Sequence, residues 1–131
     1  LQRTLIDGEH LRRCVVGAPD TLMDGFALMR GAAEAGAGVF FAEGAGAIVD
    51  CTFTGHHAER GAAVYADTAS LSLVDCSFQA NASTAPDGAT VETGEGALVL
   101  NGCAFEGNDG RRTAARGGTV VTAVSETAES P

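Results

Sequence analysis

Asp50 and Asp75 are the residues of this 131-residue chain whose spacing most directly suggests chemistry, because they occupy the same place in two copies of an internal repeat. If the copies form neighbouring strands of one sheet, the two carboxylates lie about 5 Å apart. Carboxylates at that separation suit retaining glycoside hydrolysis or the binding of Ca²⁺. The third copy has Gly102 at this place, however, and a position that accepts both Asp and Gly is typical of a turn. A structural turn is therefore the favoured interpretation.

A second group of polar residues follows the first copy of the repeat and consists of His56, His57, Glu59 and Arg60. Two imidazoles beside a carboxylate and a guanidinium have the composition of a general acid–base cluster. His56, however, occupies the place that Asn81 holds in the next copy, so we expect it to replace Asn in a turn. His57 is expected to begin a solvent-exposed loop.

The chain has four cysteines, and three of them, Cys51, Cys76 and Cys103, are spaced by 25 and 27 residues. Four cysteines allow two disulfides, but cysteines on stacked strands have parallel Cα–Cβ bonds, which is a poor geometry for bridging. Metal ligation is the alternative. A metal site needs polar groups around its ligands, and the Phe found two residues after each of these cysteines does not supply them. The pattern predicts free, buried thiols, with no metal and no other cofactor.

The three cysteines belong to a repeat that runs in three copies from residue 36 to residue 108. Self-similarity with a period of roughly 20–50 residues is typical of solenoid proteins. The copies read GAGVFFAEGAGAIVDCTFTGH, GAAVYADTASLSLVDCSFQAN and GATVETGEGALVLNGCAFEGN. Apolar columns share the period, namely Phe53, Phe78 and Phe105; Ile48, Leu73 and Leu100; and Val39, Val64, Val91 and Val120, with a last step of 29 residues.

Apolar residues alternate within each copy, as in Leu71 and Leu73, which is strand geometry. Helical repeats would instead need amphipathic segments with apolar residues three and four positions apart. In the second copy, short runs around Val64, at residues 71–73 and at residues 76–78 predict three strands. Three short strands in each copy make one rung of an all-β parallel β-helix, whose rungs stack about 4.8 Å apart. We expect four to five rungs of 25–29 residues.

Two strands of the second copy carry a family resemblance. Residues 61–65, G-A-A-V-Y, and residues 73–81, L-V-D-C-S-F-Q-A-N, resemble the G-G-A-I-Y and L-x-N-C-x-F-x-G-N strands of right-handed parallel β-helix repeats. Such repeats occur in polymorphic outer-membrane-protein-like and pectate-lyase-like chains of bacterial surfaces, and the upstream L-M-D-G-F-A-L of residues 22–28 is similar to the segment that often precedes them. The resemblance covers roughly residues 20–122 and implies a right-handed solenoid. It implies no single activity, because that fold hosts lyases, hydrolases, adhesins and inert spacers.

The lyases of this resemblance use an arginine beside several acidic Ca²⁺ ligands on one strand face. Arg111, Arg112 and Arg116 are the only dense positive charge of the chain, and the nearest acidic residues, Glu92 and Glu95, do not form such a group. We therefore expect these arginines to lie in a solvated loop or to dock an acidic partner.

The sequence predicts a single β-helix domain over residues 1–124, with an incomplete first rung at residues 1–19 and a frayed polar tail at residues 125–131. Near the start, Cys14 is aligned with Val39, and one extra residue is expected at Asp24–Gly25. No amphipathic segment caps either end, and uncapped β-helices expose strand edges that invite pairing. Other protein subunits, or the rest of a longer chain, are therefore expected to pack on the ends.

Length variation among the copies is confined to one corner, where loops of four, six and eight residues occupy residues 57–60, 82–87 and 109–116. In repeat proteins insertions gather on the face that binds, so we expect these loops to lie along one edge of the solenoid and to form its contact surface. The candidate partner-binding residues are His57, Glu59, Arg60, Asp87, Asp109, Arg111, Arg112 and Arg116.

The net charge of −9, carried with eight arginines and no lysine, argues against nucleic acid and against anionic membrane surfaces as partners. No run of 18 apolar residues predicts a membrane-spanning helix. The pattern favours a non-enzymatic structural or binding solenoid that acts through protein–protein or glycan contacts. Such a solenoid would be a segment of a larger extracellular or cell-surface protein, or a peripheral scaffold subunit of a large complex. The alternative is a fragment of a polysaccharide lyase or glycoside hydrolase with this fold.

Overall fold

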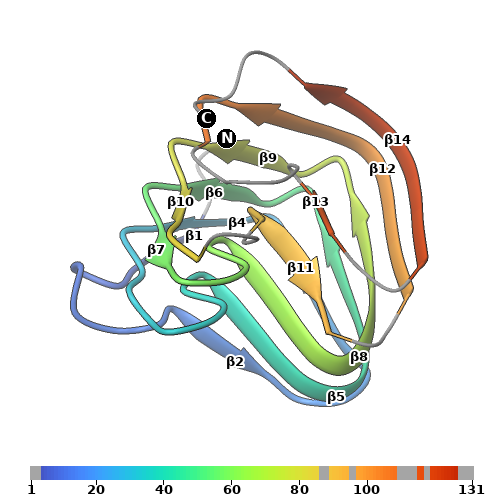
Figure 1. Ribbon diagram of the computed structural model, residues 1–131, viewed down its shortest axis with the longest axis horizontal. Coiled ribbons are helices and arrows are strands. Elements are labelled where there is room, and N and C mark those ends of the chain that lie inside the picture. The colour runs from blue at the N-terminus through green and yellow to red at the C-terminus, as the bar shows by residue number, and fades with distance from the viewer. Residues whose placement is uncertain (1–3, 86–88, 95–96, 109–114, 117–118, 127–131) are drawn as a thin grey trace.

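The computed structural model describes residues 4–85, 89–94, 97–108, 115–116 and 119–126. This part of the chain is an all-β parallel β-solenoid of about four turns and holds no helix (Figure 1). All strand pairs are parallel, and each joins strands of neighbouring turns. The predicted all-β parallel β-helix is therefore confirmed. Within the same residues, no helix is long and apolar enough to cross a membrane.

The strands follow one another in successive turns. β1 (Thr4–Asp7) precedes a first turn made of β2 (Val15–Gly17), β3 (Thr21–Asp24) and β4 (Phe26–Met29). The second turn holds β5 (Val39–Val49), β6 (Thr52–Thr54) and β7 (His57–Ala58), and the third holds β8 (Val64–Val74), β9 (Ser77–Gln79) and β10 (Ala82–Ser83). The fourth turn holds β11 (Val91–Thr93) and β12 (Ala97–Glu106), and β13 (Ala115–Arg116) and β14 (Thr119–Glu126) follow.

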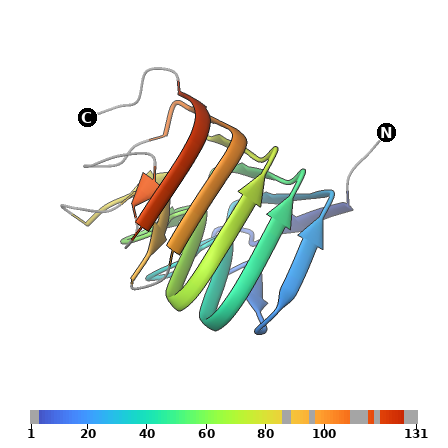
Figure 2. The same ribbon diagram turned by 90° about the vertical axis from the view of Figure 1, so that its right-hand side faces the viewer.

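The first two strands predicted for each rung are one continuous strand in β5 and in β8. Both strands bend, and their pairing continues through the bend, where Glu43 pairs with Thr68, and Ala45 pairs with Ser70. Because neighbouring turns bend at the same place, the pairing keeps one register on both sides of the bend. The result is a sheet of long strands lying side by side (Figure 2).

The predicted register holds through the middle turns. Val39, Val64 and Val91 pair in one column, and the same holds for the column of Ile48, Leu73 and Leu100 and for the column of Phe53, Phe78 and Phe105. The phenylalanine rings are buried and stack nearly parallel, with centroids 4.9 Å apart for Phe53 and Phe78 and 4.6 Å apart for Phe78 and Phe105. Leu28, which is also buried, continues this column in the first turn.

Phe41 fills the interior where β5 bends, and glycines leave the room for its ring. A Cβ atom at Gly17 would lie 2.2 Å from the ring, and one at Gly46 would lie 2.7 Å from it. Real Cβ atoms do not approach other atoms so closely, so the ring requires glycine at both positions. The column above Phe41 continues with Ala66, which is small as well.

Two predictions for the first turn are wrong. Val15, not Cys14, pairs with Val39, so the alignment of this turn was displaced by one residue. Asp24 pairs with Val49, and Ala27 pairs with Thr52, both across 25 residues, so no extra residue lies at Asp24–Gly25. Gly25 turns the chain there with a φ of +81°, so the place holds a tight turn without an extra residue.

The last turn also differs from its prediction. Val91 pairs with Ala115, and Val120 pairs with Leu98, so the predicted alignment of Val91 with Val120 is wrong. Residues 119–124, T-V-V-T-A-V, are rich in β-branched side chains and take the long position beside β12 instead of the short position beside β11. The final step is consequently shorter than the earlier ones, and β14 extends to Glu126.

Truncation of Phe78 tests the stacked column. Phe78→Ala should lower the free energy of unfolding by about 3–5 kcal/mol, because it removes a buried ring that contacts a ring on each side. Urea denaturation followed by far-UV circular dichroism measures the loss. The control is Gln79→Ala, since Gln79 is the exposed next residue on the same strand. Equal losses for the two variants would contradict the interior placement of Phe78.

Candidate functional sites

Asp50 and Asp75 lie at equivalent corners of neighbouring turns, as their spacing predicts, and both are exposed. Their backbones are left-handed, with φ of +53° and +55°, and the same corner has φ of +81° at Gly25 and +69° at Gly102. Only Gly, Asn and Asp adopt this conformation readily, so the corner itself selects these residue types. A Cβ at Gly102 would lie 2.4 Å from Asp75 Oδ1, so the acidic column has no room for a third side chain there.

His56 is part of a buried polar ladder. The ladder consists of His56, Asn81 and Asn108, which are at most 1% exposed. Each Asn accepts a hydrogen bond at Oδ1 from the backbone N–H of the residue one turn earlier, 3.0 Å away, and donates one from Nδ2 to a phenylalanine carbonyl. Asn81 also donates to Asn108 Oδ1, at 2.9 Å.

The imidazole of His56 reproduces both Asn contacts. Its Nδ1 accepts from the Gly31 N–H at 3.0 Å, and its Nε2 lies 3.0 Å from the Leu28 carbonyl oxygen. Since a backbone N–H only donates, Nδ1 is the unprotonated nitrogen and Nε2 is the donor. Burial lowers the pKa of His56 to about 4, although the hydrogen bond to the Leu28 carbonyl acts in the opposite direction and raises it. The prediction that His56 replaces Asn in a turn is confirmed.

The acid–base cluster considered around His56 is therefore not assembled. His57, in β7, is exposed and lines a hollow of about 300 Å³ together with His10, Gly55 and His56. Arg60 turns away and donates from Nη1 to Glu92 Oε2 at 2.8 Å. Glu92 is 2% exposed, so it is not available as a surface carboxylate. Among the described residues, no group of three or more His, Cys, Asp or Glu side chains is arranged to hold a metal ion.

The predicted partner-binding residues are only partly described. His57 and Glu59 are exposed, but His57 begins strand β7 and not the predicted loop, because its backbone pairs with Ala82 of β10, which begins the second predicted loop. Arg60 is half-buried in its pair with Glu92. Arg116 belongs to strand β13, where its backbone pairs with Glu92 of β11, so it does not lie in a loop. The remaining four candidates, Asp87, Asp109, Arg111 and Arg112, lie outside the described residues.

The cysteine column is interior. Cys51, Cys76 and Cys103 are free and at most 2% exposed. The Sγ atoms of Cys76 and Cys103 each lie 3.4 Å from a backbone carbonyl of the preceding turn, those of Ile48 and Leu73. The hydrogen bond with Cys103 and burial both raise the pKa of the Cys76 thiol, so it remains a neutral packing group.

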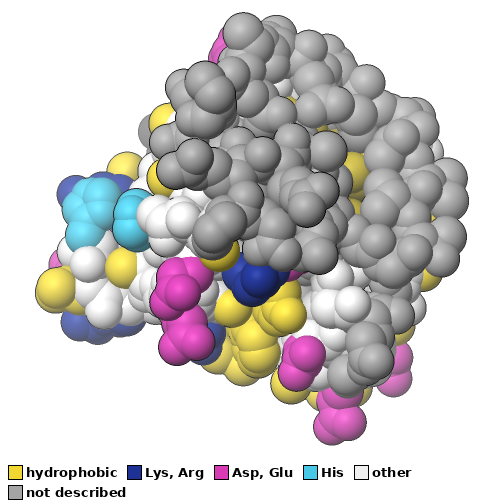
Figure 3. Space-filling view, viewed as in Figure 1, with side chains coloured by type: hydrophobic (Ala, Val, Ile, Leu, Met, Phe, Trp, Pro, Cys, Tyr) yellow, Lys and Arg dark blue, Asp and Glu magenta, His cyan; other side chains and the backbone are white. Residues whose placement is uncertain are grey.

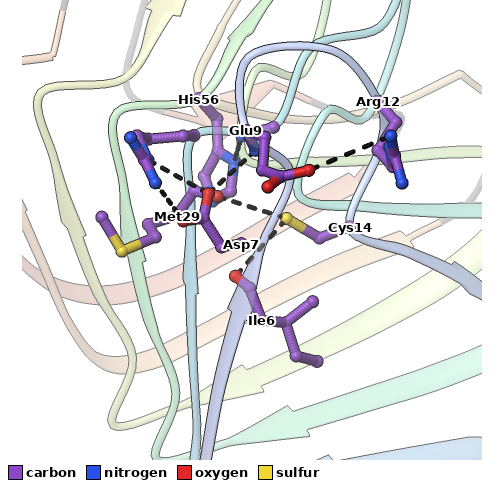
Figure 4. A network of polar contacts seen from close by, with 9 residues as sticks. Ile6, Asp7, Glu9, Arg12, Cys14, Met29 and His56 are labelled. Atoms are coloured by element: carbon purple, nitrogen blue, oxygen red, sulfur yellow. Dashed lines mark hydrogen bonds and ion pairs between the residues drawn. The ribbon is translucent and has the colours of Figure 1, made fainter.

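A polar network that was not predicted from the sequence fastens the first turn (Figure 4). Arg30 forms an ion pair with Asp7, and the Glu9 N–H donates to Asp7 Oδ1 at 2.8 Å. The hydrogen bond from Arg30 lowers the pKa of Asp7. Cys14 lies 3.5 Å from the Met29 carbonyl through its Sγ. This ion pair could have been predicted only from the register of the first turn, in which Asp7 of β1 pairs with Met29, the residue before Arg30.

An outer aromatic stack was not predicted from the sequence either. The rings of Phe40 and Tyr65 are parallel to within 11°, with centroids 5.9 Å apart. Arg13 lies over the free face of Phe40, with Cζ 4.7 Å from the ring centroid, and donates to the carbonyls of Ala35 and Gly36 at 2.8 and 3.0 Å. Its guanidinium thus caps the stack by a cation–π contact.

Comparison of the chain with family models, with curated proteins and with solved structures gives no match.

Replacing His56 by Asn should preserve the ladder and remove a pH dependence of the free energy of unfolding. In the unfolded chain His56 titrates near the usual histidine pKa of 6.5, whereas in the folded chain its pKa is about 4, so between these values the unfolded chain binds more protons. The contribution of neutral His56 to the free energy of unfolding is therefore fully present above pH 6.5. It is lost as the pH falls toward 4, by up to about 3 kcal/mol. His56→Asn should flatten this fall in urea titrations at several pH values. His57→Asn, an exposed control, should retain the fall, and a variant of His56 that kept it would contradict the assignment.

The cysteines provide a separate test. Alkylation in denaturant without reductant should modify all four thiols, as read by mass spectrometry, because none is bridged. In the native state half-buried Cys14 should react first, and the three interior thiols only on unfolding. Protection of Cys51, Cys76 and Cys103 under denaturing conditions would show that they are bridged.

Proposed function

We propose that this chain is a non-enzymatic structural and binding solenoid. It serves as a segment of a larger surface or secreted protein, or as a scaffold subunit of a larger assembly. Its contacts are with proteins or glycans, through loops and ends that the stacking of the turns leaves free. Its strands resemble right-handed β-helix repeats of polymorphic outer-membrane-protein-like chains, in which the solenoid spaces and presents surfaces.

One observation carries the proposal: in the described part of the chain, His56, Glu92 and the paired aspartates have structural roles in the turns. His56 is locked between two backbone groups, Glu92 is buried against Arg60, and the aspartates stand at a left-handed corner. A catalytic side chain needs access to substrate and freedom to change protonation. These side chains are used for structure instead.

The exposed apolar residues of the first turn support a role for the ends. The large hydrophobic residues most exposed in the described chain are Leu5, Leu11, Val16 and Leu22, which are 56–74% exposed. β1 pairs only with β4, and β2 and β3 pair only with β5, so each has an open edge. Open parallel strands flanked by apolar side chains are suited to cover by another polypeptide.

The alternative, a fragment of a polysaccharide lyase or glycoside hydrolase, is favoured by one observation, namely the adjacent carboxylates of Asp50 and Asp75. Both functions are tested by incubating the chain with a panel of neutral and acidic polysaccharides. We expect no new reducing ends and no unsaturated uronides, whereas electrophoretic retardation by one polysaccharide would identify a glycan contact.

Cleavage that is lost in Asp50→Asn and Asp75→Asn would overturn the proposal in favour of the hydrolase. The matched control is Glu34→Gln with Glu59→Gln, which removes two exposed carboxylates elsewhere. Cleavage that persists in all these variants would point to a contaminating enzyme.

A further inference from the structure

The outward side chains of β3, of the second half of β5, of β8 and of β12 form one flat surface, which we name the outer sheet face. Its strands are those that lie side by side in Figure 2. The register defines its rows: Ala45, Ser70 and Ala97; Leu22, Ala47, Ser72 and Val99; and Asp24, Val49, Val74 and Asn101. The exposed apolar residues of the middle row are Leu22, which is 65% exposed, and Val99, which is 38% exposed. Beyond Val99 the row continues with Val121 of β14.

Small residues make a hollow on this face beside Leu22. It has a volume of about 360 Å³ and is lined by Asp20, Thr21, Leu22, Ala45, Gly46, Ala47 and Ser72. Its floor consists of Ala, Gly and Ser, and Leu22 forms one wall. The hollow therefore accepts one apolar side chain of a partner beside Leu22.

Carboxylates border the outer sheet face on two sides. Asp24 is the last residue of β3, and Asp50 and Asp75 directly follow β5 and β8 at the same corner; all three are exposed. At the other border Asp20 donates its N–H to the Ala45 carbonyl, and exposed Glu43 and Asp67 lie at the bend of β5 and β8. Figure 3 shows acidic side chains, and no basic ones, at its lower right over this bend.

The four arginines whose side chains the structure describes are engaged away from this face. Arg12 lies 3.9 Å from Glu9, Arg30 pairs with Asp7 and Arg60 pairs with Glu92. Arg13 rests on the Phe40 ring. The negative field over the outer sheet face is therefore not neutralised by these side chains.

We propose that the outer sheet face binds a basic segment of a partner protein that carries an apolar side chain between Arg or Lys residues. The apolar side chain enters the hollow beside Leu22, and the cations lie against the two acidic borders. A second copy of the chain packing by the same face is disfavoured, because it would bring like-charged borders together on chains of net charge −9.

The size of the face limits the partner. Four strands at sheet spacing span about 14 Å, and four residues along a strand span about 13 Å, so the flat area is about 200 Å². A standard interface buries about 800 Å² on each partner, so a short segment is enough to cover these four strands, beyond which β14 continues the sheet. Such contacts are weak and depend on salt. This inference rests on the fold alone and does not depend on the proposed function.

The test uses the whole chain and short fluorescein-labelled peptides, with binding read by fluorescence anisotropy at low and high salt. The probe alternates Arg and Leu; one control peptide has Ser for Leu, and another has Glu for Arg. We expect saturable binding of the probe, weakened at high salt, and at least about tenfold weaker binding of both controls. Absence of binding, or equal binding of the Ser peptide, would overturn the proposal.

Variants locate the site on the outer sheet face. Ala47→Arg, which fills the hollow with a cation, and Asp24→Asn with Asp75→Asn should each weaken probe binding about tenfold. Glu34→Gln with Glu59→Gln removes the same number of charges from another part of the surface and should change binding less than about twofold. Thermal unfolding verifies that each variant is folded. Equal losses in the control variant, or full binding by folded Ala47→Arg, would place the contact elsewhere.

Discussion

In-register stacking of parallel turns is the constraint on which the rest of this structure depends. Each residue has a counterpart about 4.8 Å above and below it, so a position is selected for what stacks on itself. Phe53, Phe78 and Phe105 satisfy this with parallel rings, and the left-handed corner satisfies it with Gly25, Asp50, Asp75 and Gly102. A side chain that does not fit disturbs the packing of its own turn and of the turns above and below it. The repeat in the sequence is the record of this requirement.

The same constraint explains how polar groups are accommodated in the interior. A buried amide is costly unless both its donor and its acceptor are satisfied. The ladder of His56, Asn81 and Asn108 meets that condition by using backbone groups of the preceding turn. Among the described residues, no buried side-chain nitrogen or oxygen lacks a partner. Imidazole replaces the amide because its two nitrogens present an acceptor and a donor in the same directions, provided that it stays neutral.

The residue columns that repeat could be predicted from the sequence, and the interactions that occur only once could not. The Phe, Cys and Val columns, the Asp corner and the role of His56 follow from period and alternation alone. The pairs of Arg60 with Glu92 and of Asp7 with Arg30 each occur once, so no repeat announces them, and the second depends on the register of β1 on β4. The last turn was misjudged for a related reason. Val120 and Val121 both fit an apolar column, and a strand of β-branched residues carries little information about which neighbour it joins.

Charge is tolerated in the exposed columns of the solenoid and excluded from the buried ones. Two carboxylates about 5 Å apart repel each other by only about 1 kcal/mol where water surrounds them, so an acidic column is tolerated at an exposed corner and excluded from the core. Stacking then concentrates charge along the axis of the solenoid without any selection for a compact cluster. Recognition by such a protein is therefore expected along rows and columns of the sheet, where a partner segment meets the same residue type at each step. The outer sheet face combines this acidic periodicity with an apolar hollow, and the hollow gives a partner a fixed position on an otherwise repetitive surface.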